Sequence, residues 1–409
     1  MEVIHARCAG LDVHKDTVVA SIRVAEAGRV HRETKTFKTM TGELCALLDW
    51  LEARKCTHVA MEATGVYWKP VWHVLGETFE LVLANAADVK NVPGRKTDVN
   101  DAEWLADLLA HGLIRSNYVP EEPVQVVREL TRTRKQLVRE ATRHVQRVEK
   151  VLQDANIKLS SVLSDVMGKS ARAMLKAIID GETDPNRLVG HIHTRIGASH
   201  DEVKAALRGT VTKHHRFELK LHLKLYDQLR EAVKEVEERI SEALEPFQAV
   251  VERLTSIPGV SDTVAAVIAG EVGVAVEKFP SPGHLVSWAG LCPRMDESAG
   301  KRRSTRIRHG NSWLKTALVQ AAWSAVRTKG GHLRALFHRL KARRGAKKAI
   351  VAVAHSILSS VWHMLKYGSA WQDLGEAYLE KKDKARLARR YTTRLEALGF
   401  TVALSAANP

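Results

Sequence analysis

The spacing of hydrophobic positions changes several times along the first 118 residues. Short alternating or continuous apolar runs, which predict β-strands, are separated by stretches with the spacing of amphipathic helices. The expected strands are residues 6–13, 17–24, 29–37, 58–61 and 79–84, and the expected helices are residues 42–54, 67–75 and 98–111. The predicted order is three strands, a helix, a strand, a helix, a strand and a helix, which indicates an α/β domain.

Two later stretches predict long helices. Residues 121–160 and 216–247 carry apolar residues at steps of three or four, as in the seam of a coiled coil. The two stretches form either an antiparallel hairpin within the chain or a pair with another subunit. The intervening residues 160–215 predict short helices and loops, without a pattern that indicates chemistry.

The following segment contains a turn between two short helices. Pro258 and Gly259 end one apolar run, and a second helix is expected to start at Ser261. This arrangement predicts a helix-hairpin-helix, in which backbone N–H groups of the turn can hold a phosphate. Residues 312–326 and 346–366 predict further apolar helices.

Together these patterns predict an α/β plus α architecture. Three tightly connected strands followed by strand–helix units are typical of the ribonuclease-H-like fold. The expected parts are an α/β domain at residues 1–118, a coiled-coil region at 119–248 with a helical insertion at 160–215, a mainly helical domain at 249–370, and a basic helical tail at 371–409.

Basic residues are concentrated in one segment. Residues 291–350 hold 16 lysines and arginines and two acidic residues, whereas residues 1–118 hold 14 basic and 16 acidic residues. Most of the formal net charge of +16 therefore lies in the former segment. Such a segment repels itself unless a polyanion neutralises it. Nucleic acid is thus the leading partner, and an anionic membrane surface is the second.

Composition disfavours several classes of protein. With 45% hydrophobic and 27% charged residues, the chain is globular rather than disordered. No run of about 18 apolar residues predicts a transmembrane helix, and the first residues lack the basic start and apolar run of a signal peptide. The four cysteines are scattered without a C-x-x-C pair. This argues against zinc and a disulfide framework, and it fits a reducing cytoplasm.

Four carboxylates are placed to meet at one edge of the predicted sheet. Asp12 and Glu62 each end a strand. Asp98 and Asp101 lie three apart at the start of the last helix of the domain, where they would share one face. Gathered carboxylates repel each other unless divalent cations neutralise them, and hard oxygen ligands favour Mg²⁺ or Mn²⁺, two of which can clamp a phosphodiester. Taken singly, each acid is instead typical of a turn or a helix start.

A serine lies beside the densest basic run. Ser298, in a glycine-containing loop next to several cations, is placed to attack a phosphate and form a phosphoserine link. A solvated loop serine is the simpler interpretation, since no neighbouring residue is marked as a base. The run itself predicts nucleic-acid contacts that are mostly blind to sequence. The expected nucleic-acid-binding residues here are Pro258, Gly259, Lys301, Arg302, Arg303, Arg306, Arg308, His309 and Asn311.

A milder basic stripe follows the first long helix. Arg139, Arg143 and Arg147 are spaced by four and share one face. Glu140 and Glu149 lie nearby, so a solvated coiled-coil face and a nucleic-acid contact are equally open interpretations.

Six motifs follow one another along the chain. They are GLDVHK at residues 10–15, MEATG at 61–65, KTDVNDA at 96–102, IPGV at 257–260, AGLCP at 289–293 and the run from 298 to 311. These motifs, in this order, resemble those of the DEDD transposases of the insertion-sequence 110 class. The resemblance extends from about residue 8 to 330, and the first three motifs together are highly specific.

The resemblance implies a RuvC-like nuclease domain joined by a coiled coil to a transposase-specific domain. It implies that Asp12, Glu62, Asp98 and Asp101 bind Mg²⁺ and that Ser298 forms a covalent 5′-phosphoserine with DNA. It further implies a structured non-coding guide RNA, the bridge RNA, which pairs with donor and target DNA. Dimers would join into a tetramer in which the metal site of one subunit meets the serine of another.

One departure from the family concerns the serine. The family often has the serine directly before glycine, whereas Ala299 separates Ser298 from Gly300 here. Ser304 is therefore a second, weaker candidate for the nucleophile. Residues 160–215 would be an enlarged RNA-binding insertion or a spacer.

The leading hypothesis is thus an RNA-guided DNA recombinase that moves its own insertion sequence, in the bacterial cytoplasm and associated with the nucleoid. A metal-dependent, RuvC-like junction endonuclease without a covalent intermediate is the first alternative. A non-catalytic nucleic-acid-binding protein is the second, although such a protein has no need to gather repelling acids in one pocket.

Overall fold

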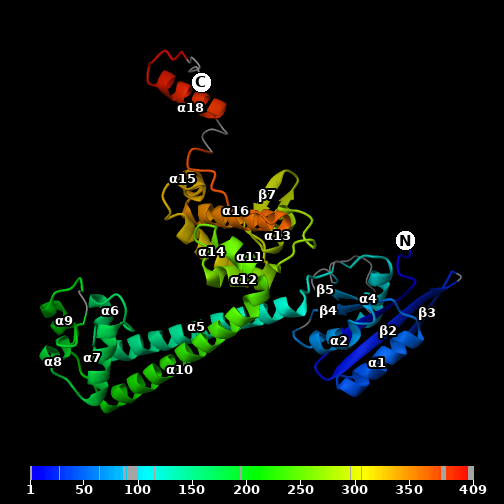
Figure 1. Cartoon of the computed structure of the whole chain (residues 1–409), viewed down its shortest axis with the longest axis horizontal. Coiled ribbons are helices and arrows are strands. Elements are labelled where there is room, and N and C mark those ends of the chain that lie inside the picture. The colour runs from blue at the N-terminus through cyan, green and yellow to red at the C-terminus, as the bar shows by residue number, and fades with distance from the viewer. Residues whose placement is uncertain are drawn as a thin grey trace. The chain divides into compact units, whose positions relative to one another are not determined.

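The computed structural model describes residues 2–26, 28–63, 65–85, 89, 100–114, 116–193, 196–294, 296–304, 306–378 and 384–403. The chain divides into two compact units, Met1–Pro120 and Glu121–Pro409, whose elements are labelled in Figure 1. The further boundaries expected inside the second unit stay predictions.

The first unit is built on a five-stranded sheet. Its strands are β1 (Arg7–Val13), β2 (Thr17–Glu26), β3 (Arg29–Lys38), β4 (His58–Glu62) and β5 (Glu80–Ala84). They lie in the order β3-β2-β1-β4-β5. The first three strands are mutually antiparallel, and β4 and β5 run parallel to β1. The predicted order of strands and helices is confirmed, and this mixed sheet fits a ribonuclease-H-like domain.

Helices cover both faces of this sheet. They are α1 (Thr41–Ala53), α2 (Trp68–Leu75) and α4 (Asp101–Ala110). Leu11 of β1 belongs to a core with Leu47 of α1 and Leu75 of α2, whereas Cys8 of β1 clusters with Leu109 of α4. Because both faces of β1 are covered, its sequence is almost continuously apolar rather than alternating.

The contact between β1 and α4 depends on Gly10. A Cβ atom on this residue would overlap the carbonyl oxygen of Ala102. It would also lie 2.5 Å from the amide nitrogen of Ala106 and 2.7 Å from Cβ of Leu105. Backbone atoms of a packed helix cannot give way as a flexible side chain can, so only glycine fits here.

We expect Gly10→Ala to lower the free energy of unfolding by about 1–3 kcal/mol, because the added methyl group forces α4 away from β1. Gly42→Ala is the matched control. Gly42 lies in the first turn of α1 with open space around its Cβ position, and alanine favours a helix there. Denaturant unfolding measures both variants. Wild-type stability in Gly10→Ala would contradict the close packing of β1 and α4.

The second unit begins with two long antiparallel helices, α5 (Glu122–Asp154) and α10 (Lys213–Leu244). Arg134 near the start of α5 pairs with Glu237 near the end of α10, and Asp154 at the end of α5 pairs with His215 at the start of α10. Of the two expected pairings, the structure therefore contains the one within the chain. Coiled-coil geometry and pairing with another subunit stay predictions.

Four short helices between α5 and α10 form a small bundle at the end of the helix pair (Figure 1). They are α6 (Leu159–Val162), α7 (Lys169–Asp180), α8 (Pro185–Val189) and α9 (His200–Ala206). Met174 and Leu175 of α7 are buried in a core that also contains Leu152 of α5 and Leu219 of α10. A core of this kind indicates a folded module. Its proposed RNA-binding role stays a prediction.

Most of the helices that follow α10 pack against α16 or against a neighbour of it. They are η1 (Glu245–Phe247), α11 (Gln248–Thr255), α12 (Asp262–Val272), α13 (Pro282–Trp288), α14 (Ser312–Ala325), α15 (His332–Arg344) and α16 (Ala346–Tyr367), with a two-stranded hairpin of β6 (Asp296–Ser298) and β7 (Lys301–Ser304). Beyond them, α18 (Lys384–Ala397) forms the expected basic helix of the tail.

Among the described helices, α16 alone has the length and apolar composition of a membrane span, which the sequence pattern did not predict. Half of that apolar window is buried inside the protein. Val353, Ile357 and Leu358 of α16 are fully buried, and α13, α14 and α15 pack against the helix. This burial is what the central helix of a folded domain requires.

Candidate active site

Two of the predicted carboxylates end neighbouring parallel strands. In the pairing of β1 with β4, Leu11 lies opposite Met61, so Asp12 and Glu62 occupy the next position at the carboxyl ends of the strands. Side chains alternate between the faces of a sheet, so Asp12 lies on the same face as Gly10. That face is the one covered by α4. The register therefore places both acids at one edge and on one face.

The direction of α4 brings its start to the same edge. The Sγ atom of Cys8 donates to the carbonyl oxygen of Ala106 at 3.5 Å, and Gly10 packs against Ala102. Each step of two residues along β1 thus moves four residues back along α4. One further step passes the first residue of α4, so Asp12 lies at the end of the sheet where this helix begins.

Asp101 is the first residue of that helix. Asn100 precedes it with an extended backbone (ψ 141°), and its side chain caps the helix by accepting from the amide of Ala102 at 3.1 Å. The helix therefore begins at Asp101 rather than at residue 98 as expected, and the placement of Asp98 beside Asp101 stays a prediction. Asp98 itself lies outside the described residues.

The donor chemistry of these acids fits a divalent cation. Asp12, Glu62 and Asp101 are hard oxygen ligands. Within the described ranges, however, no three histidine, cysteine or acidic side chains form a group that could hold an ion. Asp12 instead contacts His14, with 3.1 Å between Oδ2 and Nε2. A metal site at these acids stays a prediction.

Ser298 lies at the tip of a hairpin that the sequence pattern did not predict. It is the last residue of β6 and pairs with Lys301, the first residue of β7. Ala299 and Gly300 form the two-residue turn with φ values of 51° and 72°. Two positive φ values define a type I′ turn, which favours Asn-Gly or Gly-Gly and strains alanine. The register sets Ser298 and Lys301 directly side by side.

The two candidate serines differ in their surroundings. Ser298 is exposed, and its hydroxyl group makes no hydrogen bond to another described residue. Ser304 is half-buried, and its Oγ accepts a hydrogen bond from the amide of Arg306 at 3.2 Å. Ser298 is thus better placed to meet a substrate, and Ser304 to shape the base of the hairpin.

Two glycines hold the base of the hairpin together. The amide of Arg294 donates to the carbonyl of Arg306 at 2.8 Å, which extends the pairing of the two arms. Below this pair, Gly290 and Gly310 meet backbone to backbone. A Cβ on Gly310 would lie 2.5 Å from the amide nitrogen of Gly290. Both motif glycines are therefore explained by this close approach.

Most of the predicted basic contacts surround this hairpin and face solvent. Lys301, Arg303, Arg306, Arg308 and His309 are exposed. The backbone of Arg302 lies in β7, and its side chain is outside the described set. The structure leaves these cations available to a polyanion, and their binding role stays a prediction.

The side chain of Asn311 instead makes its hydrogen bonds within the protein. Its Oδ1 accepts from the amides of Trp313 and Leu314, which caps α14, and its Nδ2 donates to Glu271 at 2.6 Å. Glu271 is fully buried and accepts two hydrogen bonds from Arg132 of α5, at 2.7 and 2.8 Å. This network ties the hairpin base to α5 and α12. No local pattern along the chain predicts this network, because its partners lie far apart in the sequence.

We expect Glu271→Ala to lower the free energy of unfolding of the second unit by about 3–5 kcal/mol, because it leaves Arg132 partly buried without its carboxylate. Glu237→Ala is the control, since it removes another arginine-bound glutamate at an exposed site, where an ion pair contributes about 0–1 kcal/mol. Thermal unfolding compares them. Equal losses of unfolding free energy in the two variants would mean that the Glu271 network stabilises the unit no more than an exposed ion pair does.

The predicted helix-hairpin-helix turn joins α11 to α12. Gly259 has φ 84°, and a Cβ there would lie 2.5 Å from the amide nitrogen of Ala325 in α14. The amide of Val260 donates to Ile257 within the turn. Packing against α14 is thus sufficient to require glycine at 259. Phosphate binding by Pro258 and Gly259 stays a prediction.

The arginine stripe on α5 faces solvent, and its first member also contacts an aromatic ring. The guanidinium carbon of Arg139 lies 5.6 Å from the ring centre of Trp313, in a cation–π contact. Arg143 and Arg147 are exposed. All three arginines are thus exposed, and their contact with nucleic acid stays a prediction.

The proteins similar to this chain are described as transposases or insertion-element proteins. A family model described as a transposase, of the DEDD type of IS110 elements, matches residues 9–157, and one described as the transposase IS116/IS110/IS902 family matches residues 251–338. The first match includes Asp12, Glu62, Asp98 and Asp101, and the second includes Ser298.

Three relatives support these matches. The "Insertion element IS110 uncharacterized 43.6 kDa protein" of Streptomyces coelicolor is 26% identical over 328 residues, which cover 73% of this chain and 78% of that protein. The "Putative transposase y4rJ" of Sinorhizobium fredii is 24% identical over 288 residues, 67% of each chain. The "Transposase for insertion sequence element IS1111A" of Coxiella burnetii is 30% identical over 143 residues, 33% of this chain and 38% of that protein.

Proposed function

Because this chain belongs to the IS110 family of transposases and is an enzyme that acts on DNA, we propose that it cuts and rejoins DNA through metal-bound carboxylates and a covalent phosphoserine. The observation that carries this proposal is the placement of Asp12 and Glu62 in register at one sheet edge, opposite the start of α4 at Asp101. Mutually repelling acids at one edge are costly unless a cation compensates them.

Transposases of the DEDD type generally depend on a divalent metal. In this chain Asp12, Glu62, Asp98 and Asp101 would hold it, and their oxygen ligands favour Mg²⁺ or Mn²⁺. When bound, the cation supplies electrostatic stabilisation of charge on the phosphodiester. The backbone positions of Asp12, Glu62 and Asp101 are set by β1, β4 and α4, which carry these residues.

The proposed cleavage step uses Ser298. Its Oγ attacks the phosphorus of a phosphodiester and loses its proton, and the bond from phosphorus to the 3′ oxygen breaks. The products are a 5′-phosphoserine and a 3′-hydroxyl that has gained a proton. A 3′-hydroxyl of another strand then attacks the phosphoserine and releases Ser298, so no external energy is needed. Lys301, paired with Ser298 across the hairpin, is placed to stabilise negative charge on the phosphate.

The partners of the proposed reaction are donor DNA, target DNA and a structured non-coding guide RNA. The exposed cations at and below the hairpin support contact with such polyanions. We further propose a dimer that joins into a tetramer, which would let the metal site of one subunit meet the serine of another. The expected location is the bacterial cytoplasm, at the nucleoid.

A covalent-adduct assay tests the proposal. Protein, guide RNA, Mg²⁺ and end-labelled junction DNA are incubated, denatured and separated by size. Label that migrates with the protein supports the phosphoserine mechanism. Free 5′-phosphate and 3′-hydroxyl ends without an adduct would select the RuvC-like junction endonuclease instead, because that enzyme needs the carboxylates and not Ser298.

A further inference from the structure

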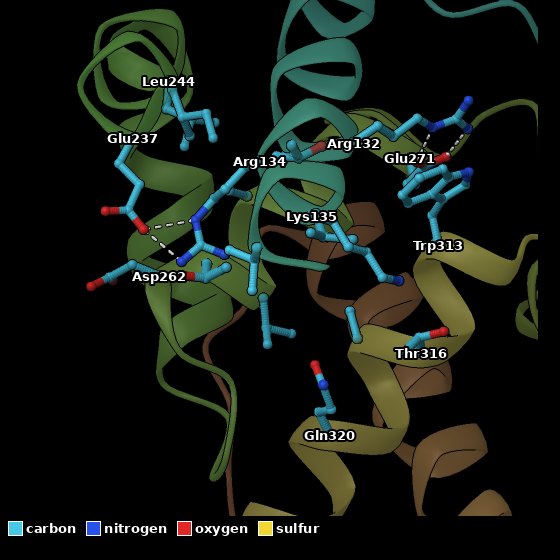
Figure 2. Close-up of a pocket in the computed structure, with 18 of the residues that line it drawn as sticks. Arg132, Arg134, Lys135, Glu237, Leu244, Asp262, Glu271, Trp313, Thr316 and Gln320 are labelled. Carbon is cyan, nitrogen blue, oxygen red and sulfur yellow. Dashed lines mark hydrogen bonds and ion pairs between the residues drawn. The ribbon is translucent and has the colours of Figure 1, made fainter. Parts of the chain in front are cut away.

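A cavity of about 610 Å³ lies in the second unit between α5, α10, α12 and α14 (Figure 2). The proposed cleavage chemistry makes no use of it. Apolar side chains from all four helices line it, namely Val138, Ile240, Leu244, Val264, Val267 and Ala317. Thr316 and Gln320 of α14 add polar groups, and Figure 2 shows the Gln320 amide directed toward this space.

Trp313 and three cations form one wall of the cavity. The guanidinium carbons of Arg132 and Arg139 lie 5.5 and 5.6 Å from the centre of the indole ring, and Nζ of Lys135 lies 5.1 Å from it. All three cations project from α5, at spacings that share a helix face. Three cations thus lie near one aromatic ring, whereas a cation–π contact needs only one.

The charge of this wall is only partly compensated. Arg132 is held by the buried Glu271 through two hydrogen bonds. Lys135 and Arg139 form no ion pair with a described residue, and at a spacing of four they repel each other. Burial lowers the pKa of Lys135, the neighbouring Arg139 lowers it further, and Glu271 opposes the change. Glu237 and Asp262 also line the cavity, and Glu237 is paired with Arg134. The half-buried Lys135 and the exposed Arg139 therefore lie beside Trp313 without a carboxylate of the described residues in ion-pair contact with them.

We propose that this cavity binds one unpaired nucleotide of a nucleic-acid strand, with the base beside Trp313 and the phosphate on Lys135 and Arg139. An apolar slot with an aromatic wall and adjacent cations suits a single-stranded nucleotide, since stacking and phosphate contacts act together. A paired base inside a duplex is not accessible to such a slot. The inference rests on the proposed function in requiring a nucleic-acid partner, and it is independent of the serine chemistry.

The test is a fluorescence-anisotropy titration of the full-length protein with short labelled single strands of RNA and of DNA. We expect Lys135→Gln, Arg139→Gln and Trp313→Ala each to weaken binding about 10-fold, and Trp313→Phe to stay within about 3-fold of wild type. Lys220→Gln is the matched control, because Lys220 is an exposed lysine of α10 that does not line the cavity. Wild-type affinity in Lys135→Gln, or an equal loss in Lys220→Gln, overturns the proposal.

A second titration isolates the base. Wild-type protein is compared on the normal strand and on a strand of the same length with abasic nucleotides. We expect the abasic strand to bind about 10-fold more weakly, and equal affinity overturns a base-binding cavity. A preference for RNA or for DNA in either titration supports the proposal and identifies the strand that supplies the nucleotide.

Failure of the cavity can be separated from failure of the proposed function. Trp313→Ala is also examined by circular dichroism, and the glutamine variants retain the length of the side chains they replace, so a folding defect is recognised. If the cavity variants bind strands as wild type does while the adduct still forms, only the cavity inference fails. If no adduct forms but Lys135→Gln still weakens binding, only the serine chemistry fails.

Discussion

Replacing Ser298 with alanine is expected to abolish the covalent protein–DNA adduct and to reduce strand exchange by on the order of 10⁴-fold or more, as for loss of other nucleophiles. Ser298 is exposed at the tip of the β6–β7 hairpin and lies directly opposite Lys301. Without its hydroxyl group no phosphoserine can form there. The measurement is the amount of label retained on denatured protein, followed over time.

Ser304→Ala is the matched control for this experiment. Ser304 lies in the same hairpin, but its hydroxyl already accepts a hydrogen bond from the backbone of Arg306. We expect this variant to keep the adduct. An adduct in Ser298→Ala and none in Ser304→Ala would move the nucleophile to Ser304. Adducts in both variants, and in Asp12→Ala as well, would show that neither site performs this chemistry.

Asp12→Asn is expected to lower strand cleavage by on the order of 10³-fold while leaving DNA binding at least as tight as in wild type. The substitution keeps the size of the side chain and removes one negative charge from the edge shared with Glu62 and Asp101. Weaker cation binding slows cleavage, whereas loss of an acid does not weaken attraction to a polyanion. Cleavage of labelled DNA is measured across a titration of Mg²⁺ and of Mn²⁺.

Asp16→Asn is the control for the carboxylate site. Asp16 is an exposed acid in the turn between β1 and β2, four residues away from Asp12. Its replacement by asparagine removes the same charge as Asp12→Asn does. We expect cleavage close to that of wild type. Full activity in Asp12→Asn, or equal losses in both variants, would remove Asp12 from the proposed metal site.

Much of the first unit could be predicted from its sequence, because burial there is regular. β1 is covered on both faces and reads as a continuous apolar run, and the helices show apolar stripes. The placement of Asp12 and Glu62 at strand ends followed from the same pattern. The first residue of α4 did not, because a local cap by Asn100 starts the helix at Asp101 rather than at residue 98.

The second unit was harder to predict where long-range contacts decide the structure. The hairpin around Ser298 has a turn of Ala299 and Gly300, and alanine gives no signal of a type I′ turn. The role of Asn311 depends on Glu271, which lies 40 positions earlier. The cavity wall combines Trp313 with cations of α5, and no spacing along the chain relates them.

The antiparallel pair of α5 and α10 has a consequence for the evolution of this chain. A straight helix of 33 residues is about 50 Å long. The length of the helix pair therefore sets the distance between the helices that follow α10 and the α6–α9 bundle. The side-chain contacts between the two helices allow only certain changes in their length, because each added residue also rotates the helix end. Adding about seven or about 11 residues to each helix would move the bundle outward by about 10 or 16 Å and nearly preserve its facing, whereas adding about five or nine would turn it to another side. Relatives with arms of different length would thus be expected to differ in whole repeats.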